Sequence, residues 1–191
     1  MSKAPKKRRS PLTRRHTHAL GLIVTRWAIL EDMLRWGIVR LFFKEEIGGF
    51  IVTGQMEYRH KRDIFRAWIS VLQDAPAIKE LASILDEIER LSKIRLLAAH
   101  RMWVRGRKPG AIKPMSFESR GNVRMRGHDH NEPNFTAEQL EAEAKAIERA
   151  YGRFTAWIDA VAPIPAPVRP KIKRRSTKER AAASPAADPP K

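Results

Sequence analysis

Apolar side chains recur at three- and four-residue steps in four stretches of this chain, the pattern of helices that bury one face. The first stretch spans about 18–43, with Leu20, Ile23, Trp27, Leu30, Leu34, Ile38 and Leu41. The second spans about 55–72, with Ile64, Trp68 and Val71. The third carries Leu81, Leu85, Ile88, Leu91, Ala98 and Met102. The fourth carries Leu140, Ala144, Ile147, Tyr151, Phe154, Ile158 and Val161.

Local signals predict where these helices begin and end. Gly48-Gly49 should end the first element or the turn after it, and a short apolar link at 50–52 should lead to the second. Asp74 followed by Pro76 predicts the start of the third helix, as an N-cap with a proline in the first turn. Thr136 and Gln139 form a capping box that opens the fourth. We therefore predict an all-α fold, a bundle of about four helices over 17–162.

The helical period is lost between 105 and 135, where glycine and proline recur. A loose β-hairpin or an extended loop folded over the bundle is expected there, with its turn near 120–122. An insertion of this length inside a compact domain is usually functional or mobile.

Composition limits the domain organisation and the compartment. The 191 residues suffice for one domain with a hydrophobic core, and we expect a disordered basic arm at 1–16 and a disordered Pro/Ala-rich basic tail at 163–191. The absence of cysteine excludes disulfides and favours a reducing, cytoplasmic environment. No apolar run approaches the roughly 18–20 residues of a membrane span, and no apolar stretch of a secretory signal follows the basic N-terminus. No membrane partner is expected.

The net charge of +17 is concentrated in three segments. Residues 1–17 contain seven Lys/Arg and no acid, 101–126 contain eight and one, and 169–191 contain eight and two. Such segments attract polyanions and predict salt-dependent binding of nucleic acid. The candidate contact residues are Lys6, Lys7, Arg8, Arg9, Arg101, Arg105, Arg107, Lys108, Arg120, Arg124, Arg126, Lys173, Arg174 and Arg175. The basic positions of the second helix are expected to form a solvated face: Arg59, His60, Lys61, Arg62 and Arg66.

Arg95 and His100 are the candidate catalytic residues. Arg95 follows Ile88 and Leu91 on the apolar face of its helix, where a cation must find an anion or a phosphate. Glu31, at the border of the first apolar stripe, is either a solvated carboxylate or the group that neutralises Arg95. His100 carries the side-chain type whose usual pKa suits proton transfer near neutral pH.

The Arg95-x4-His100 spacing followed by Trp103, together with a Trp27-x3-Glu31 step in a long first helix, resembles the signature of the HEPN family of all-helical nucleic-acid-processing domains. As a layout the resemblance covers about 17–162. Many members carry a polar residue directly after the arginine, a position that is Leu96 here.

The resemblance implies a metal-independent endoribonuclease that needs no cofactor. His100 would take the proton from the 2′-hydroxyl of RNA while Arg95 stabilises charge on the phosphoryl oxygens, with Glu31 and Trp103 in supporting roles. Because the 2′-hydroxyl is the nucleophile, RNA is the favoured substrate. On a straight helix a five-residue step turns two side chains about 140° apart. Unless the helix ends or distorts near Ala99, the two side chains converge more easily when a second copy packs at a two-fold interface and each motif completes the other, which predicts a homodimer.

The same residues have a structural interpretation. Arg95 and Glu31 would then close a buried ion pair and His100 would bond a carbonyl at a helix end, leaving a non-catalytic module. Such a module would bind nucleic acid or a protein partner through its basic tails and loop. His128 and His130 flank Asp129, but two histidines without an anchored third ligand do not predict a metal site.

Overall fold

The computed structural model describes residues 12–71, 76–115, 118–120, 122–124 and 133–162, the two short middle segments by their backbone course alone. Within these residues the fold is mostly helical, as predicted. The helices are α1 (Arg14–Phe42), α2 (Glu46–Gly54), α3 (Tyr58–Val71), α4 (Pro76–His100) and α5 (Ala137–Val161). The strands are β1 (Met102–Arg105), β2 (Ala111–Met115), β3 (Glu118–Arg120), β4 (Asn122–Arg124) and β5 (Phe135–Thr136).

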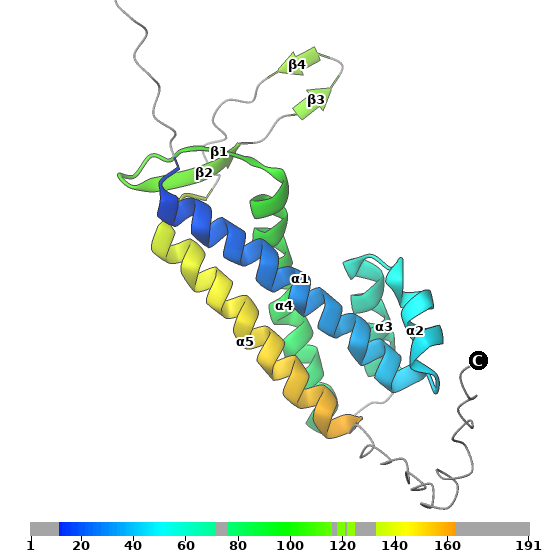
Figure 1. Cartoon of the computed structure of the whole chain (residues 1–191). Coiled ribbons are helices and arrows are strands. Elements are labelled where there is room, and N and C mark those ends of the chain that lie inside the picture. Colours follow the sequence, from blue (N-terminus) through cyan, green and yellow to red (C-terminus); the bar gives the residue numbers. More distant parts are fainter. Residues whose placement is uncertain (1–11, 72–75, 116–117, 121, 125–132, 163–191) are drawn as a thin grey trace, which may run out of the picture.

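Three long helices form the body of the molecule (Figure 1). α1 and α5 run in the same direction, because Arg15 at the start of α1 bonds Glu141 at the start of α5 and Arg40 bonds Asp159 near both ends. α4 runs against them, and α2 and α3 cover the far end of α1 (Figure 1).

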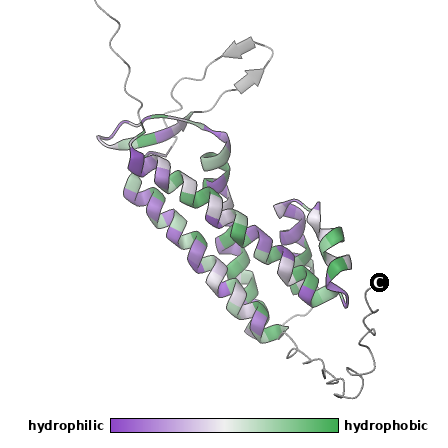
Figure 2. Ribbon diagram, viewed as in Figure 1, coloured by the Kyte–Doolittle hydropathy of each residue, from purple (hydrophilic) through white to green (hydrophobic). Residues whose placement is uncertain are grey.

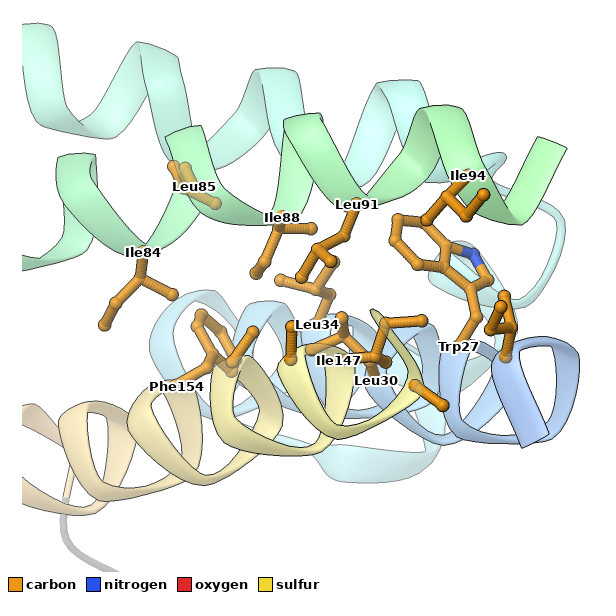
Figure 3. Packing of buried hydrophobic residues seen from close by; sticks show 14 of the residues in the cluster. Trp27, Leu30, Leu34, Ile84, Leu85, Ile88, Leu91, Ile94, Ile147 and Phe154 are labelled. Atoms are coloured by element: carbon orange, nitrogen blue, oxygen red, sulfur yellow. The ribbon is translucent and has the colours of Figure 1, made fainter. Parts of the chain in front are cut away.

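The hydrophobic core lies between α1, α4 and α5. Figure 3 shows the α4 side chains pointing toward residues of α1 and α5. From α4 these are Ile84, Leu85, Ile88, Leu91 and Ile94; from the other two helices they are Trp27, Leu30, Leu34, Ile147 and Phe154. Each aliphatic or aromatic side chain so buried contributes about 1.5–3 kcal/mol. The apolar stripes expected from the sequence thus face one common core, except that Met102, expected in the third helix, lies in β1 and is 58% exposed because α4 ends at His100.

α2 is the main departure from the predicted layout, since Gly48-Gly49 lies inside a helix and the expected link at 50–52 is part of it. Gly49 faces the end of α1, where a Cβ would lie 2.9 Å from Val39 Cγ1. Glycine leaves this space to the side chains of Val39 and Phe43, so a tertiary contact overrides the local helix-ending signal. The number of helices is therefore five within the described residues, not about four.

Helix starts also differ from the prediction. α1 begins four residues earlier than expected, because Thr13 and His16 form a capping box that the apolar stripe does not reveal. α3 begins at Tyr58 instead of about 55. The predicted capping box of Thr136 and Gln139 at the start of α5 is confirmed.

The insertion contains two antiparallel hairpins in place of one loose hairpin or loop. β1, β2 and β5 form a three-stranded sheet beside the N-terminal ends of α1 and α5 (Figure 1). β3 pairs with β4 so that Arg120 lies opposite Asn122, which confirms the predicted turn position. Among the described helices, none combines the length and apolar character needed to cross a bilayer.

Candidate functional site

A groove of about 560 Å³ opens between α1, α3 and α4. It is lined by Trp27, Glu31, Glu57, Tyr58, Arg59, Arg62, Glu89, Ser92, Lys93, Arg95 and Leu96. One predicted catalytic residue, Arg95, and one predicted supporting residue, Glu31, therefore lie on the same concave surface.

α4 places Arg95 at the flank of its buried stripe. Ile88, Leu91 and Ile94 face the core, and Arg95, seven residues after Ile88, lies about 20° from Ile88 at the edge of this stripe, where it lines the groove. Arg95 is half-buried in the groove wall and makes no hydrogen bond or ion pair within the part of the chain that the structure describes. The cation is thus placed where an anion can reach it, in a partly desolvated setting.

Glu31 pairs with a residue that neither of the two expectations named. Its Oε1 lies 3.0 Å from Lys61 Nζ, and Trp27 Nε1 donates a hydrogen bond to Oε2 at 3.2 Å. Glu31 is partly buried, its side chain 24% exposed, and it pairs with Lys61 and not with Arg95. Lys61, expected on a solvated face, is 6% exposed. The long side chain of Lys61 reaches from α3 to the carboxylate on α1. Helical periodicity within α3 does not predict this contact between two helices.

The ion pairs along the groove leave it with excess positive charge. Lys61 neutralises Glu31, and Arg62 lies 3.2 Å from a carboxylate oxygen of Glu89. The remaining charged lining residues are three cations, Arg59, Lys93 and Arg95, and one acid, Glu57. None of these four is ion-paired within the described residues, so an anion entering the groove meets cations that are not already neutralised.

Tyr58 adds an unused donor to the groove. Its ring packs edge-on against Trp27 with centroids 5.0 Å apart, and its buried Oη has no hydrogen-bond partner among the described residues. Burial raises the pKa of Tyr58 to about 12, while the nearby Arg62 acts to lower it. The phenol therefore stays protonated near neutral pH and keeps its capacity to donate a hydrogen bond.

His100 lies outside the groove. It is the last residue of α4 and is exposed, and α4 continues as a helix through Ala99. The five-residue step to Arg95 therefore keeps its separation of about 140°. One chain does not bring the two predicted catalytic side chains together. The exposed apolar side chains of Leu96 and Met102, 52% and 58% exposed, lie near His100 in the sequence.

Trp103 belongs to the core and not to the groove. It is 7% exposed and packs edge-on against Phe135 with ring centroids 5.9 Å apart. This contact attaches β1 to β5, so the residue holds the sheet and does not line the site.

The predicted nucleic-acid contacts fall into three groups. Arg101, Arg105, Arg107 and Lys108 are exposed around the end of α4 and the β1–β2 turn. Arg120 and Arg124 belong to β3 and β4, where the backbone alone is described. Lys6, Lys7, Arg8, Arg9, Arg126, Lys173, Arg174 and Arg175 lie outside the described residues, as do His128, Asp129 and His130.

The sequence interpretation missed Tyr58, Arg59 and Lys93 as parts of the site. Lys93 lies about 160° from Arg95 around α4, so the spacing of the two residues does not mark them as parts of one site. No local signal marks Tyr58 or Arg59, since only the packing of α3 against α1 brings them to the groove.

Comparisons with protein-family models, with curated proteins and with solved structures found no match for this chain. The chemistry of the groove residues therefore indicates which class of ligand suits the groove. They offer three cations that have no ion-pair partner within the described residues, together with the Tyr58 phenol, around a cavity large enough for a nucleotide.

Proposed function

We propose that this chain is a HEPN-like RNA-binding protein in which Arg95 holds a backbone phosphate in the groove between α1, α3 and α4. The observation that carries the proposal is the contrast among the groove cations. Lys61 and Arg62 are ion-paired, whereas Arg95 is half-buried without a partner among the described residues. A guanidinium matches phosphate oxygens with two parallel hydrogen bonds, which makes arginine the preferred residue for this contact.

The surroundings of Arg95 support the same ligand. Arg59 and Lys93 add positive charge, and Tyr58 Oη offers a neutral donor. Beyond the groove, the exposed Arg101 and Arg105 extend the positive surface past the end of α4. A single strand can follow such a path because its backbone bends more readily than a duplex, and its phosphates then meet one cation after another.

The test is the affinity for a fluorescent single-stranded RNA, measured by anisotropy at fixed salt. Arg95→Gln should weaken binding roughly tenfold, the loss of one charge-assisted hydrogen-bonded contact. Arg90→Gln is the matched control, because Arg90 lies on the same helix but pairs with Glu143 of α5 at 3.0 Å. Equal affinities of the two variants would contradict the proposal.

A second candidate function is endoribonuclease activity, favoured by the exposed imidazole of His100 at the free end of α4. In a two-fold dimer, Arg95 of one copy and His100 of the other would act on one phosphodiester. The histidine would accept the 2′-hydroxyl proton, the oxygen would attack phosphorus, and the 5′-oxygen would leave, giving a 2′,3′-cyclic phosphate. The exposed Leu96 and Met102 provide apolar surface for that contact.

Cleavage of single-stranded RNA in EDTA tests this candidate. His100→Ala and Arg95→Ala should each abolish cleavage, and cyclic phosphate ends should mark the product. Mixing the two inactive variants should restore about a quarter of the activity, because half of the dimers are mixed and each has one intact site. Cleavage that survives in His100→Ala would exclude this mechanism and leave RNA binding as the function.

A further inference from the structure

α1 carries a second apolar stripe, on a side of the helix that the described residues cover only in part. At 100° per residue, this stripe falls within an arc of about 60° and consists of Leu22, Ile29, Met33 and Trp36. The middle of the arc lies about 120° around the helix from the middle of the stripe that faces the core. A helix that is apolar on more than one side is usually covered on more than one side. The second stripe therefore indicates a contact in addition to the core.

A hollow of about 520 Å³ lies on this face of α1, next to α5. It is lined by Ala28, Ile29, Asp32, Met33, Trp36 and Tyr151. All of these except Asp32 are apolar or aromatic, and Ile29 is 56% exposed. An apolar side chain that enters from outside would therefore meet mainly apolar side chains.

α2 extends the apolar face beyond the hollow. Trp36 packs edge-on against Phe50 of α2, with ring centroids 4.8 Å apart. Ile47 lies one turn before Phe50 and is 78% exposed. Figure 2 shows α2 as a hydrophobic helix at the edge of the bundle. The face formed by the second stripe of α1 thus continues onto α2, and the two parts together are called the outer face below.

The charges beside the hollow are neutralised within the chain. Arg26 of α1 lies 3.0 Å from Glu148 of α5, and Asp32 pairs with Arg35. This part of the surface is therefore close to neutral, although the chain has a net charge of +17. A polyanion would find little attraction here. A second copy is not repelled, and in a two-fold arrangement Arg26 of one copy can lie opposite Glu148 of the other.

The size of the outer face suits a dimer. From Leu22 to Trp36 the helix rises about 21 Å, and with the adjoining flank of α5 the face is about 20 Å wide. α2 adds an area of about 13 Å by 10 Å. Each copy therefore offers about 550 Å², so that two copies bury about 1,100 Å² in total, above the roughly 1,000 Å² expected of a specific interface.

We propose that the outer face of α1 and α2 is the contact surface of a two-fold homodimer. The same patch of both copies then meets, and Ile29 of each copy packs into the apolar hollow of the other. Trp27 and Glu31, the groove residues of α1, lie about 150–170° around the helix from the middle of the second stripe. Both grooves therefore stay open in the dimer. One long RNA strand can occupy both, a consequence that rests on the proposed RNA-binding function.

Sedimentation velocity of the full-length chain tests the contact, in about 0.15 M salt, where charges more than about 8 Å apart are largely screened. The chain should sediment as a dimer. Ile29→Glu should raise the dissociation constant of the dimer at least about a hundredfold, because each copy would bury an unpaired carboxylate. Val24→Glu is the matched control and should leave the dimer intact. It adds the same charge to the same helix at an aliphatic residue that is 38% exposed and about 140° around from Ile29.

Ile47→Glu provides a second variant, at an exposed position of α2 on which the core does not depend. It should weaken the dimer about tenfold, because it lies toward the edge of the outer face. Circular dichroism should show the same helix content in all variants.

Three results would overturn the contact. The first is a chain that stays monomeric at every concentration, and the second is an equal dissociation constant for Ile29→Glu and Val24→Glu. The third is a dimer that survives Ile29→Glu but dissociates in Met102→Glu, which would assign the interface to the end of α4. The measurement contains no RNA, so the dimer contact and the proposed function fail separately.

Discussion

Lys61 Nζ lies 3.0 Å from Glu31 Oε1 and thereby frees Arg95, the nearby cation on the same groove, from serving as the counter-ion of that carboxylate. The lysine side chain is 8% exposed and the glutamate side chain 24% exposed, so solvent screens the pair only in part. The positive character of the groove depends on this buried pairing, which comes from α1 and α3 and not from α4.

Replacing Lys61 with methionine should destabilise the fold by about 1–3 kcal/mol, because Glu31 is left partly buried without its counter-ion. The double variant Glu31→Gln, Lys61→Met should recover much of that loss. Urea unfolding followed by circular dichroism measures both. If the single and double variants unfold at the same urea concentration, the two side chains are not coupled.

The same Lys61→Met substitution should weaken RNA binding, although the lysine itself is almost completely buried. The uncompensated carboxylate would draw Arg95 away from the ligand and oppose a phosphate in the groove. Anisotropy with single-stranded RNA should show a lower affinity for Lys61→Met and a recovery in the double variant. An unchanged affinity would show that Glu31 does not influence the bound phosphate.

Adjacent glycines of α2 should respond in opposite ways to alanine. Gly48 is open, because a methyl group added there would have no atom within 4 Å, so Gly48→Ala should stabilise the helix by up to about 1 kcal/mol. At Gly49 a Cβ would lie 2.9 Å from Val39 Cγ1 and 3.0 Å from Phe43 Cγ, so Gly49→Ala should destabilise by about 1–3 kcal/mol. Thermal unfolding of the pair compares them directly, and matching shifts would argue against the close approach of α2 to α1.

Alkaline pH should destabilise the fold through Tyr58, because burial raises the pKa of this side chain to about 12. An exposed phenol in the unfolded chain ionises near pH 10, so between about pH 10 and 12 the unfolded state releases a proton that the folded state keeps. Stability should fall as pH rises through this window. Absorbance titration of Tyr151→Phe, which leaves Tyr58 as the single tyrosine, should give a midpoint near 12 in the folded protein and near 10 in urea. A folded midpoint near that of the unfolded chain would contradict the burial of Tyr58 Oη.

Removing residues 1–11 and 169–191 should flatten the salt dependence of RNA binding, because each lost phosphate contact reduces the slope of log affinity against log salt by about 0.7 for a single strand. The N-terminal deletion should end at 11, since Thr13 caps α1 and Arg15 bonds Glu141. Arg95→Gln in the shortened chain should still weaken binding. An unchanged slope would exclude the arms as contact surfaces.

The apolar stripes could be predicted because they depend on helical geometry alone, and Leu30, Ile88 and Phe154 all lie in the common core. The start of α5 was equally predictable, since Thr136 and Gln139 satisfy the helix end by local bonds. α2 was not predictable in this way. Its glycines oppose a helix locally, and the contact of Gly49 with Val39 exists only once α1 is in place.

The same distinction between local pattern and tertiary packing holds for the candidate site. The sequence by itself determined which side chains carry the chemistry and that Arg95 and His100 diverge on one helix, because the spacing of residues along an α-helix fixes their directions. Only the tertiary structure decided that Glu31 pairs with Lys61, that Tyr58 and Arg59 join Arg95 on one groove, and that Trp103 belongs to the core. Partners from different helices are chosen by the way the helices pack, and no pattern within a single helix carries that information.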